Sequence, residues 1–131
     1  MKENVIKAIM LVSGALTFTM IYAAIAPEAA LRSNFGEALA GPVAEIVVRN
    51  WGALIALVGA MLIYGAFQPR VRALVLVVAA VSKVLFIALV LTLGRQFLGY
   101  SVGVAVVIDA IMVVLFVSYL VGAGRTIAAT G

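Results

Sequence analysis

Residues 71–93 read VRALVLVVAAVSKVLFIALVLTL, and residues 101–123 read SVGVAVVIDAIMVVLFVSYLVGA. Each stretch exceeds the roughly 20 residues that an α-helix needs to cross the hydrocarbon core of a bilayer. After Arg72 at its start, the first stretch contains one charged residue, Lys83, and the second contains only Asp109. Because the connection between them is short, we expect two neighbouring, antiparallel membrane-spanning helices.

Two further stretches have the same character. Residues 5–26 are almost entirely apolar and end before Pro27, and residues 46–67 end before Gln68-Pro69-Arg70. A signal peptide is the alternative for the first stretch, but the apolar run is longer than the hydrophobic region of such a peptide. The chain therefore predicts a single all-α membrane domain over residues 1–131. We expect a four-transmembrane-helix bundle with up-down-up-down topology.

The composition leads to the same fold class. Of the 131 residues, 66% are hydrophobic and 11% are charged, whereas soluble domains have roughly 45–50% apolar and about 25% charged residues. This composition excludes an ordinary soluble domain, a large catalytic head and a nucleic-acid-binding module. The chain has no cysteine and no histidine, which excludes thiolate nucleophiles, Cys/His zinc sites and His-ligated haem. We expect no cofactor and no enzymatic activity.

The basic residues predict the orientation of the chain. Cytoplasmic loops of membrane proteins carry an excess of Lys and Arg. One side of the expected bundle has five basic residues and the other has three, so we expect both termini in the cytoplasm. The five are Lys2, Lys7, Arg70, Arg72 and Arg125, and the three are Arg32, Arg49 and Arg95. The net charge of +4 is then a topology signal.

The connection between the first two spans has a helical pattern of its own. In PEAALRSNFGEALAGP, residues 27–42, the apolar residues Leu31, Phe35 and Leu39 recur at intervals of four. Pro27 and Glu28 suit a helix start, and Gly41-Pro42 suits a stop. We expect a short amphipathic helix over residues 28–40 in the outer interface. It would cap the bundle or, alternatively, act as a lid over a ligand.

Small residues form a stripe along the second span. They share this face with Arg49 and permit close approach of another helix, so the stripe should face the bundle. Arg49 then points inward or reaches the outer interface, and the alternative is an ion pair with Glu45 one turn earlier. The stripe consists of Arg49, Gly52, Ala56, Gly59, Ala60 and Ile63.

Lys83 and Asp109 are the sharpest feature of the chain. A charged side chain near the bilayer centre costs about 2.5–3.5 kcal/mol on insertion scales. At 1.5 Å per helical residue, Lys83 lies roughly 15 Å and Asp109 roughly 12 Å below the outer ends of their spans. We therefore predict an intramembrane ion pair. Arg49 is a possible third member, and Asn50 beside it is a further candidate for a polar site.

The purpose of this pair has two interpretations. A buried ion pair can fix the register and rotation of two helices. Alternatively, it can form a polar pocket for a lipid head group or a quinone-like carbonyl, or a proton-coupled transport site, since intramembrane carboxylates often lie on such pathways. We expect the aromatic residues near the span ends to be interfacial anchors. These are Trp51, Tyr64, Tyr100 and Tyr119.

The order of these parts resembles the DoxX-like small four-helix membrane proteins. The likeness rests on the span layout, on Arg49-Asn50-Trp51-Gly52 continuing to Gly59, and on the turn Gln68-Pro69-Arg70-Val71-Arg72. The family takes its name from a subunit of quinol oxidase complexes. The resemblance implies an accessory subunit, or a protein that binds quinones or lipids, and it carries over no catalytic residue.

Two other families of small four-helix proteins fit less well. Small multidrug transporters depend on a carboxylate in the first span, which here has none, so Asp109 in the fourth span would have to replace it. Dual-topology fluoride channels have an arginine-bearing, glycine-rich first helix that this chain lacks.

The sequence thus predicts a non-enzymatic protein of the bacterial inner membrane. It would bind a lipophilic or amphiphilic ligand, or act as an accessory subunit of a membrane complex. The alternative is an oligomeric proton-coupled transporter or ion channel that uses Asp109 and Lys83. The expected partners are membrane lipid, a lipophilic ligand, and further copies of the chain or a larger complex, and they do not include nucleic acid.

Overall fold

The computed structural model describes residues 2–130, with the backbone alone for residues 125–130. Within this range the chain is all-α and contains no strand. The helices are α1 (Glu3–Phe18), α2 (Ile21–Ile25), α3 (Pro27–Phe35), α4 (Pro42–Phe67), α5 (Pro69–Leu93), the short 3-10 helix η1 (Arg95–Phe97) and α6 (Ser101–Thr130). The described residues contain four segments long and apolar enough to cross a membrane, which confirms the predicted fold class. These are Glu3–Ile25, Pro42–Phe67, Pro69–Leu93 and Ser101–Gly124.

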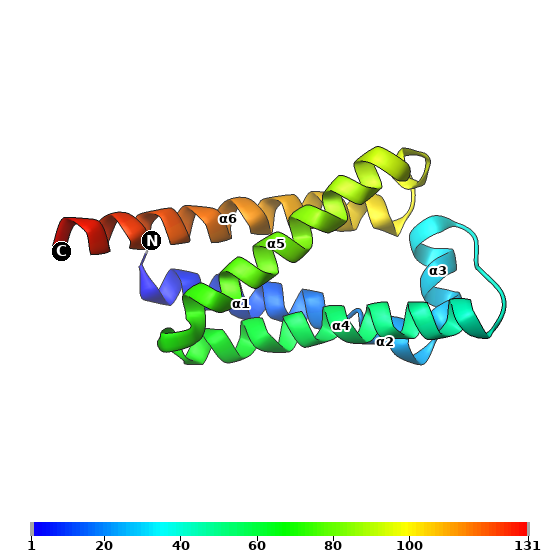
Figure 1. Ribbon diagram of the computed structural model, residues 1–131, viewed down its shortest axis with the longest axis horizontal. Helices are drawn as coiled ribbons and strands as arrows, with labels where there is room; N and C mark the ends of the chain where they lie inside the picture. The colour runs from blue at the N-terminus through cyan, green and yellow to red at the C-terminus, as the bar shows by residue number, and fades with distance from the viewer. Residues whose placement is uncertain (1, 131) are drawn as a thin grey trace.

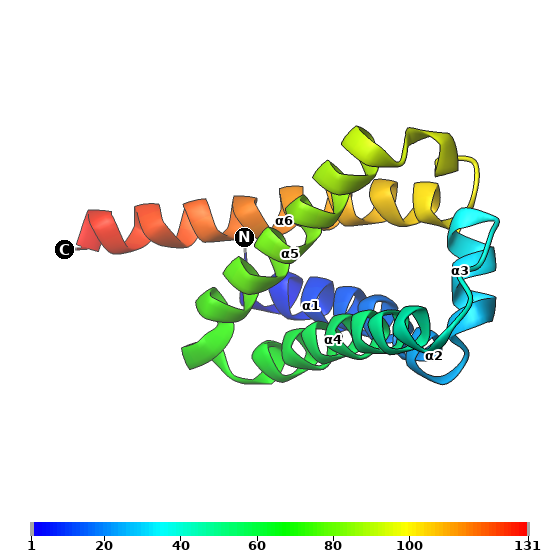
Figure 2. The ribbon, with the colours of Figure 1, turned by 45° about the vertical axis from the view of Figure 1, so that its right-hand side comes forward.

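The four long segments lie along the length of the molecule (Figures 1 and 2). The chain changes direction from α1 to α4, from α4 to α5 and from α5 to α6, and α5 crosses the other helices obliquely (Figure 1). Helix α3 lies across one end of the bundle, which we call the α3 end. The start of α1, the end of α6 and the α4–α5 turn lie toward the opposite end, which we call the turn end.

The first span is interrupted, which corrects the expectation of one helix over residues 5–26. Helix α1 stops at Phe18, and α2 begins at Ile21 after a turn at Thr19 and Met20. The Thr19 hydroxyl donates to the Leu16 carbonyl, and such bonds to nearby carbonyls offer the backbone an alternative to the helical ladder. The turn lets α2 change direction before Pro27.

The helix in the first connection is shorter than the predicted 28–40. It ends at Phe35 because Gly36 takes a left-handed conformation with φ of 77°, which glycine adopts without steric cost. Leu39 therefore lies outside the helix and is exposed. Gly41-Pro42 is a helix start and not a stop, because Gly41 has φ of 104° and Pro42 occupies the first turn of α4, where proline needs no N–H partner.

Close contact between α1–α2 and α4 depends on glycine. A Cβ atom on Gly52 would lie 2.6 Å from Ala23 Cβ, and one on Gly14 would lie 2.7 Å from the Gly59 carbonyl oxygen. The small-residue stripe of α4 therefore does face another helix. Ala60 does not belong to it, because its side chain is exposed.

The main hydrophobic core lies toward the turn end, where all four long helices contribute to it. At this end Arg72 is 4% exposed and acts as a cap. Its Nε and Nη2 donate to the carbonyls of Gly65 and Ala66 at 3.1 and 2.8 Å, and its Nη1 lies 3.7 Å from Glu3 Oε1. Arg72 thus satisfies carbonyls that the end of α4 leaves without helical partners. The largest fully buried core side chains are Phe116, Ile6, Met10, Leu62 and Leu76.

Candidate ligand-binding cavity

Lys83 and Asp109 form the predicted ion pair. Lys83 Nζ lies 2.9 Å from Asp109 Oδ1, with 6% of the lysine side chain and 19% of the aspartate side chain exposed. Lys83 Nζ also donates to Thr17 Oγ1 at 3.1 Å. The pair therefore connects α5 to α6 and, through Thr17, to α1.

Thr17 is a member that our reading of the sequence missed. The signal for it was available, because Thr17 precedes Ala26 by nine residues and so lies roughly 13 Å below the outer end of the first span. This depth matches those of Lys83 and Asp109.

The ion pair lies in the wall of a cavity of about 350 Å³. Ligand sites in proteins typically have volumes of about 300–1,000 Å³, with mostly apolar walls and a few polar groups. Along α6 the lining runs from Ser101 to Met112, which is about 16 Å at 1.5 Å per residue. Apolar side chains from α1, α4, α5 and α6 form most of the wall, including Leu16, Trp51, Ile55, Val58, Phe86, Val104 and Ile108.

Asp109 presents a free acceptor at this cavity. Its Oδ1 accepts from Lys83, whereas no described residue donates to its Oδ2. Every fully buried side-chain nitrogen and oxygen among the described residues has a partner. Oδ2 is therefore not fully buried, and because Asp109 lines the cavity, this oxygen can accept a hydrogen bond there.

Polar groups also line the cavity near the α3 end. Asn34 is 5% exposed, and its Nδ2 donates to the Tyr22 hydroxyl and to the Ala30 carbonyl, both at 2.9 Å. The Tyr22 hydroxyl and Ser33 Oγ lie 3.1 Å apart. Sequence reasoning identified neither Tyr22 nor Asn34, since their pairing depends on the α1–α2 turn that brings α2 against α3.

The exposed residues that line the cavity come from the end of the α1 segment and from α6. These two helices hardly touch, because α1 packs mainly on α4 and α6 mainly on α5. The lining residues Leu16 and Thr19 on one side, and Ser101 and Val104 on the other, are exposed. A molecule on the apolar flank of the bundle can therefore reach the cavity.

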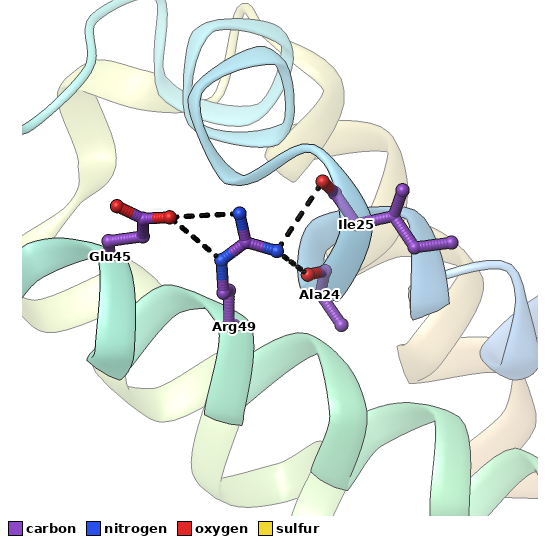
Figure 3. Close-up of polar contacts among 4 residues, drawn as sticks. All are labelled: Ala24, Ile25, Glu45 and Arg49. Atoms are coloured by element: carbon purple, nitrogen blue, oxygen red, sulfur yellow. Dashed lines mark hydrogen bonds and ion pairs between the residues drawn. The ribbon is translucent and has the colours of Figure 1, made fainter.

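Arg49 is not a third member of the ion pair. Its Nε and Nη2 donate to Glu45 Oε1 at 3.0 and 2.8 Å, and its Nη1 donates to the carbonyls of Ala24 and Ile25 (Figure 3). It lines a separate polar space of about 520 Å³ at the α3 end. The alternative pairing with Glu45 is thus correct, and the carbonyls at the end of α2 hold the guanidinium away from Lys83 and Asp109.

The other sequence candidates lie in different surroundings. Asn50 is exposed and lines neither the cavity nor the space beside Arg49. Trp51 is half-buried and lines the cavity, and Tyr119 is half-buried against the main core. Tyr64 and Tyr100 are exposed. The anchoring role of these four residues stays a prediction.

Comparison with protein-family models, with curated proteins and with solved structures finds no match to this chain.

Proposed function

We propose that the protein is a non-enzymatic integral membrane protein that binds a small, uncharged amphiphile in the cavity beside Lys83 and Asp109. The observation that carries this proposal is an apolar cavity whose wall contains a charge-compensated ion pair with an unused acceptor. A lipid-like or quinone-like molecule fits this description.

The ion pair favours an uncharged polar group. Lys83 and Asp109 neutralise each other at 2.9 Å, so a charged ligand group would enter the apolar cavity without a counter-charge. Such burial is strongly unfavourable. A hydroxyl group, by contrast, can donate to Asp109 Oδ2.

Lys83 adds a hydrogen-bond donor. An ammonium group has three N–H donors, and two are directed at Thr17 and Asp109. The third is available to a carbonyl oxygen. A ligand with a hydroxyl or carbonyl group on an apolar body therefore matches both members of the pair.

The DoxX-like resemblance supports the same class of ligand, because that family is associated with quinol oxidase complexes. We further propose the bacterial inner membrane as the location, with the turn end and both termini in the cytoplasm. Partner copies or a larger membrane complex would contact the exposed apolar flanks of the bundle.

A second candidate function is a proton-coupled transporter or channel formed by an oligomer. The observation that favours it is the extent of the cavity, which reaches from Tyr22, Asn34 and Ser101 near the α3 end to the Asp109 carboxylate. Flux into liposomes separates the two functions. A proton or solute flux that the substitution Asp109→Asn abolishes would support transport. If liposomes with the wild-type protein show no more flux than protein-free liposomes, the result would support binding alone.

Native mass spectrometry of the protein released from its membrane tests the binding function. The comparison variant is the double substitution K83M/D109L, because replacing a buried ion pair by apolar residues of similar size is often neutral or stabilising. Ser118→Ala is the control, since Ser118 is exposed on α6 and bonds to the Val114 carbonyl. We expect the wild type and S118A to retain a bound amphiphile that K83M/D109L lacks. Equal retention by all three, or no bound amphiphile in any, would contradict the proposal.

A further inference from the structure

An apolar groove adjoins the cavity. It has a volume of about 430 Å³ and lies between α3, α4, α5 and η1. Trp51 and Phe86 line both the groove and the cavity. The two spaces are therefore neighbours that share a wall made of these two side chains.

One face of α5 connects the two spaces. Lys83 lines the cavity, Phe86 lines both, and Leu89, Val90 and Leu93 line the groove. These residues follow the three- and four-residue spacing of one helix face. Between Lys83 and Leu93 this face extends for about 15 Å.

The two spaces differ in chemistry. Apart from the indole of Trp51, no side chain that lines the groove carries a polar atom. The cavity, by contrast, contains the ion pair, Thr17, Tyr22 and Asn34. This division suits a ligand with a polar head at one end and a hydrocarbon chain at the other.

The two members of the shared wall are held differently. The Trp51 ring lies 6.4 Å from Phe35, whose ring makes an edge contact with Phe97 at 5.2 Å. Phe86 is half-buried and packs against the cluster of Val90, Val102 and Val106, without an aromatic partner among the residues that the structure describes. A chain that extends from the cavity into the groove therefore passes these two packed side chains.

We propose that the cavity and the groove form one site for a single-chain amphiphile. The uncharged head group lies at Lys83 and Asp109, and the hydrocarbon chain passes Phe86 and lies in the groove. Val47, Leu89 and Leu93 at the groove are largely exposed, so the end of the chain reaches the bilayer between α4 and α5. This inference rests on the proposed function and names its ligand class more closely.

Trp51 provides the probe, because it is the only tryptophan of the chain. The protein is placed in phosphatidylcholine nanodiscs and titrated with tetradecanol that carries bromine, a fluorescence quencher, on its terminal carbon. Binding at the site is measured by the component of the quenching that saturates with the concentration of the brominated alcohol. Unbrominated alcohols reverse this component when they displace the brominated alcohol from the site. Hexanol and tetradecanol then serve as the short and the long competitor.

Two double variants test the groove. V47F/L89F adds aromatic rings to its two sides, whereas L54F/L85F adds the same rings to exposed positions of α4 and α5 that line neither space. With each alcohol expressed as a mole fraction of the bilayer lipid, which removes the difference in partitioning, we expect tetradecanol to compete about tenfold more strongly than hexanol in the wild type and in L54F/L85F, through van der Waals contacts with the groove walls. In V47F/L89F this advantage should disappear while hexanol binds as in the wild type.

Equal competition by hexanol and tetradecanol in the wild type would overturn the inference and leave the proposed function intact. The same holds if the two double variants bind tetradecanol alike. Absence of any saturable quenching by the brominated alcohol in the wild type would instead overturn the proposed ligand class, and with it the inference.

Discussion

Lys83 and Asp109 are each the only charged residue within the middle of their helices, and each needs a partner. Their pairing was predictable because helical rise converts sequence position into depth, and a short connection makes α5 and α6 neighbours. The same arithmetic applies to Thr17. It fails for Arg49, because backbone carbonyls at the end of α2 compete for the guanidinium and their position depends on a turn that hydropathy does not reveal.

The ion pair predicts a non-additive response to substitution. Lys83→Met leaves the Asp109 carboxylate without its counter-ion and should lower the free energy of unfolding by about 3 kcal/mol. K83M/D109L removes both charges and should unfold close to the wild type. Unfolding in mixed detergent micelles, followed by circular dichroism, measures both. Equal losses in the single and the double variant would show that the pairing contributes nothing.

At the scale of single elements, the long helices follow from apolar length, whereas their ends follow from local chemistry. Proline begins α3, α4 and α5, and left-handed Gly36 ends α3. The spacing of Leu31, Phe35 and Leu39 favours a longer α3, but spacing cannot override a glycine that turns the chain. The break after Phe18 also left no signal in the hydropathy of the first span.

Arg49 should stabilise α2 specifically. It donates to carbonyls at the end of this helix, whereas the Arg32 side chain donates to the Glu28 carboxylate four residues away and not to a backbone carbonyl. Arg49→Met should therefore accelerate amide hydrogen exchange in α2 and the residues just after it, because their backbone hydrogen bonds open more often. Arg32→Met is the matched control, and equal acceleration in both variants would contradict a capping role.

Gly59 should tolerate no side chain. A Cβ atom there would lie 2.7 Å from the Gly14 carbonyl oxygen and closer still to the Phe18 backbone. Gly59→Ala should lower the free energy of unfolding by about 1–3 kcal/mol through overpacking. Gly124→Ala is the control, because a Cβ atom at Gly124 has nothing within 4 Å. An apparent Tm that falls equally in both variants would show that close approach is not the cause.

At the scale of the whole molecule, the spans were predictable and the cavity was not. Four apolar segments follow from composition and length, but the cavity exists because α1 and α6 hardly touch while each packs on another helix. No local pattern encodes that divergence. The groove beside Trp51 likewise depends on α5, which crosses the bundle obliquely (Figure 1).

The proposed orientation predicts a labelling pattern. The chain has no cysteine, so Lys2→Cys, Gln68→Cys and Ser33→Cys each provide one reactive thiol. A membrane-impermeant maleimide applied to intact cells should label S33C at the α3 end. The other two should react only in inverted vesicles, which expose the cytoplasmic face. Labelling of Q68C in intact cells would contradict a cytoplasmic turn end.

We propose that the Lys83–Asp109 pair binds an uncharged amphiphile. The most direct measurement is a titration of Trp51 fluorescence with decanol in nanodiscs, because Trp51 lines the cavity. We expect a saturable fluorescence change in the wild type and in S118A. In K83M/D109L we expect only the linear response that partitioning of decanol into the bilayer produces. The same saturation in K83M/D109L, or none in the wild type, would contradict binding at the ion pair.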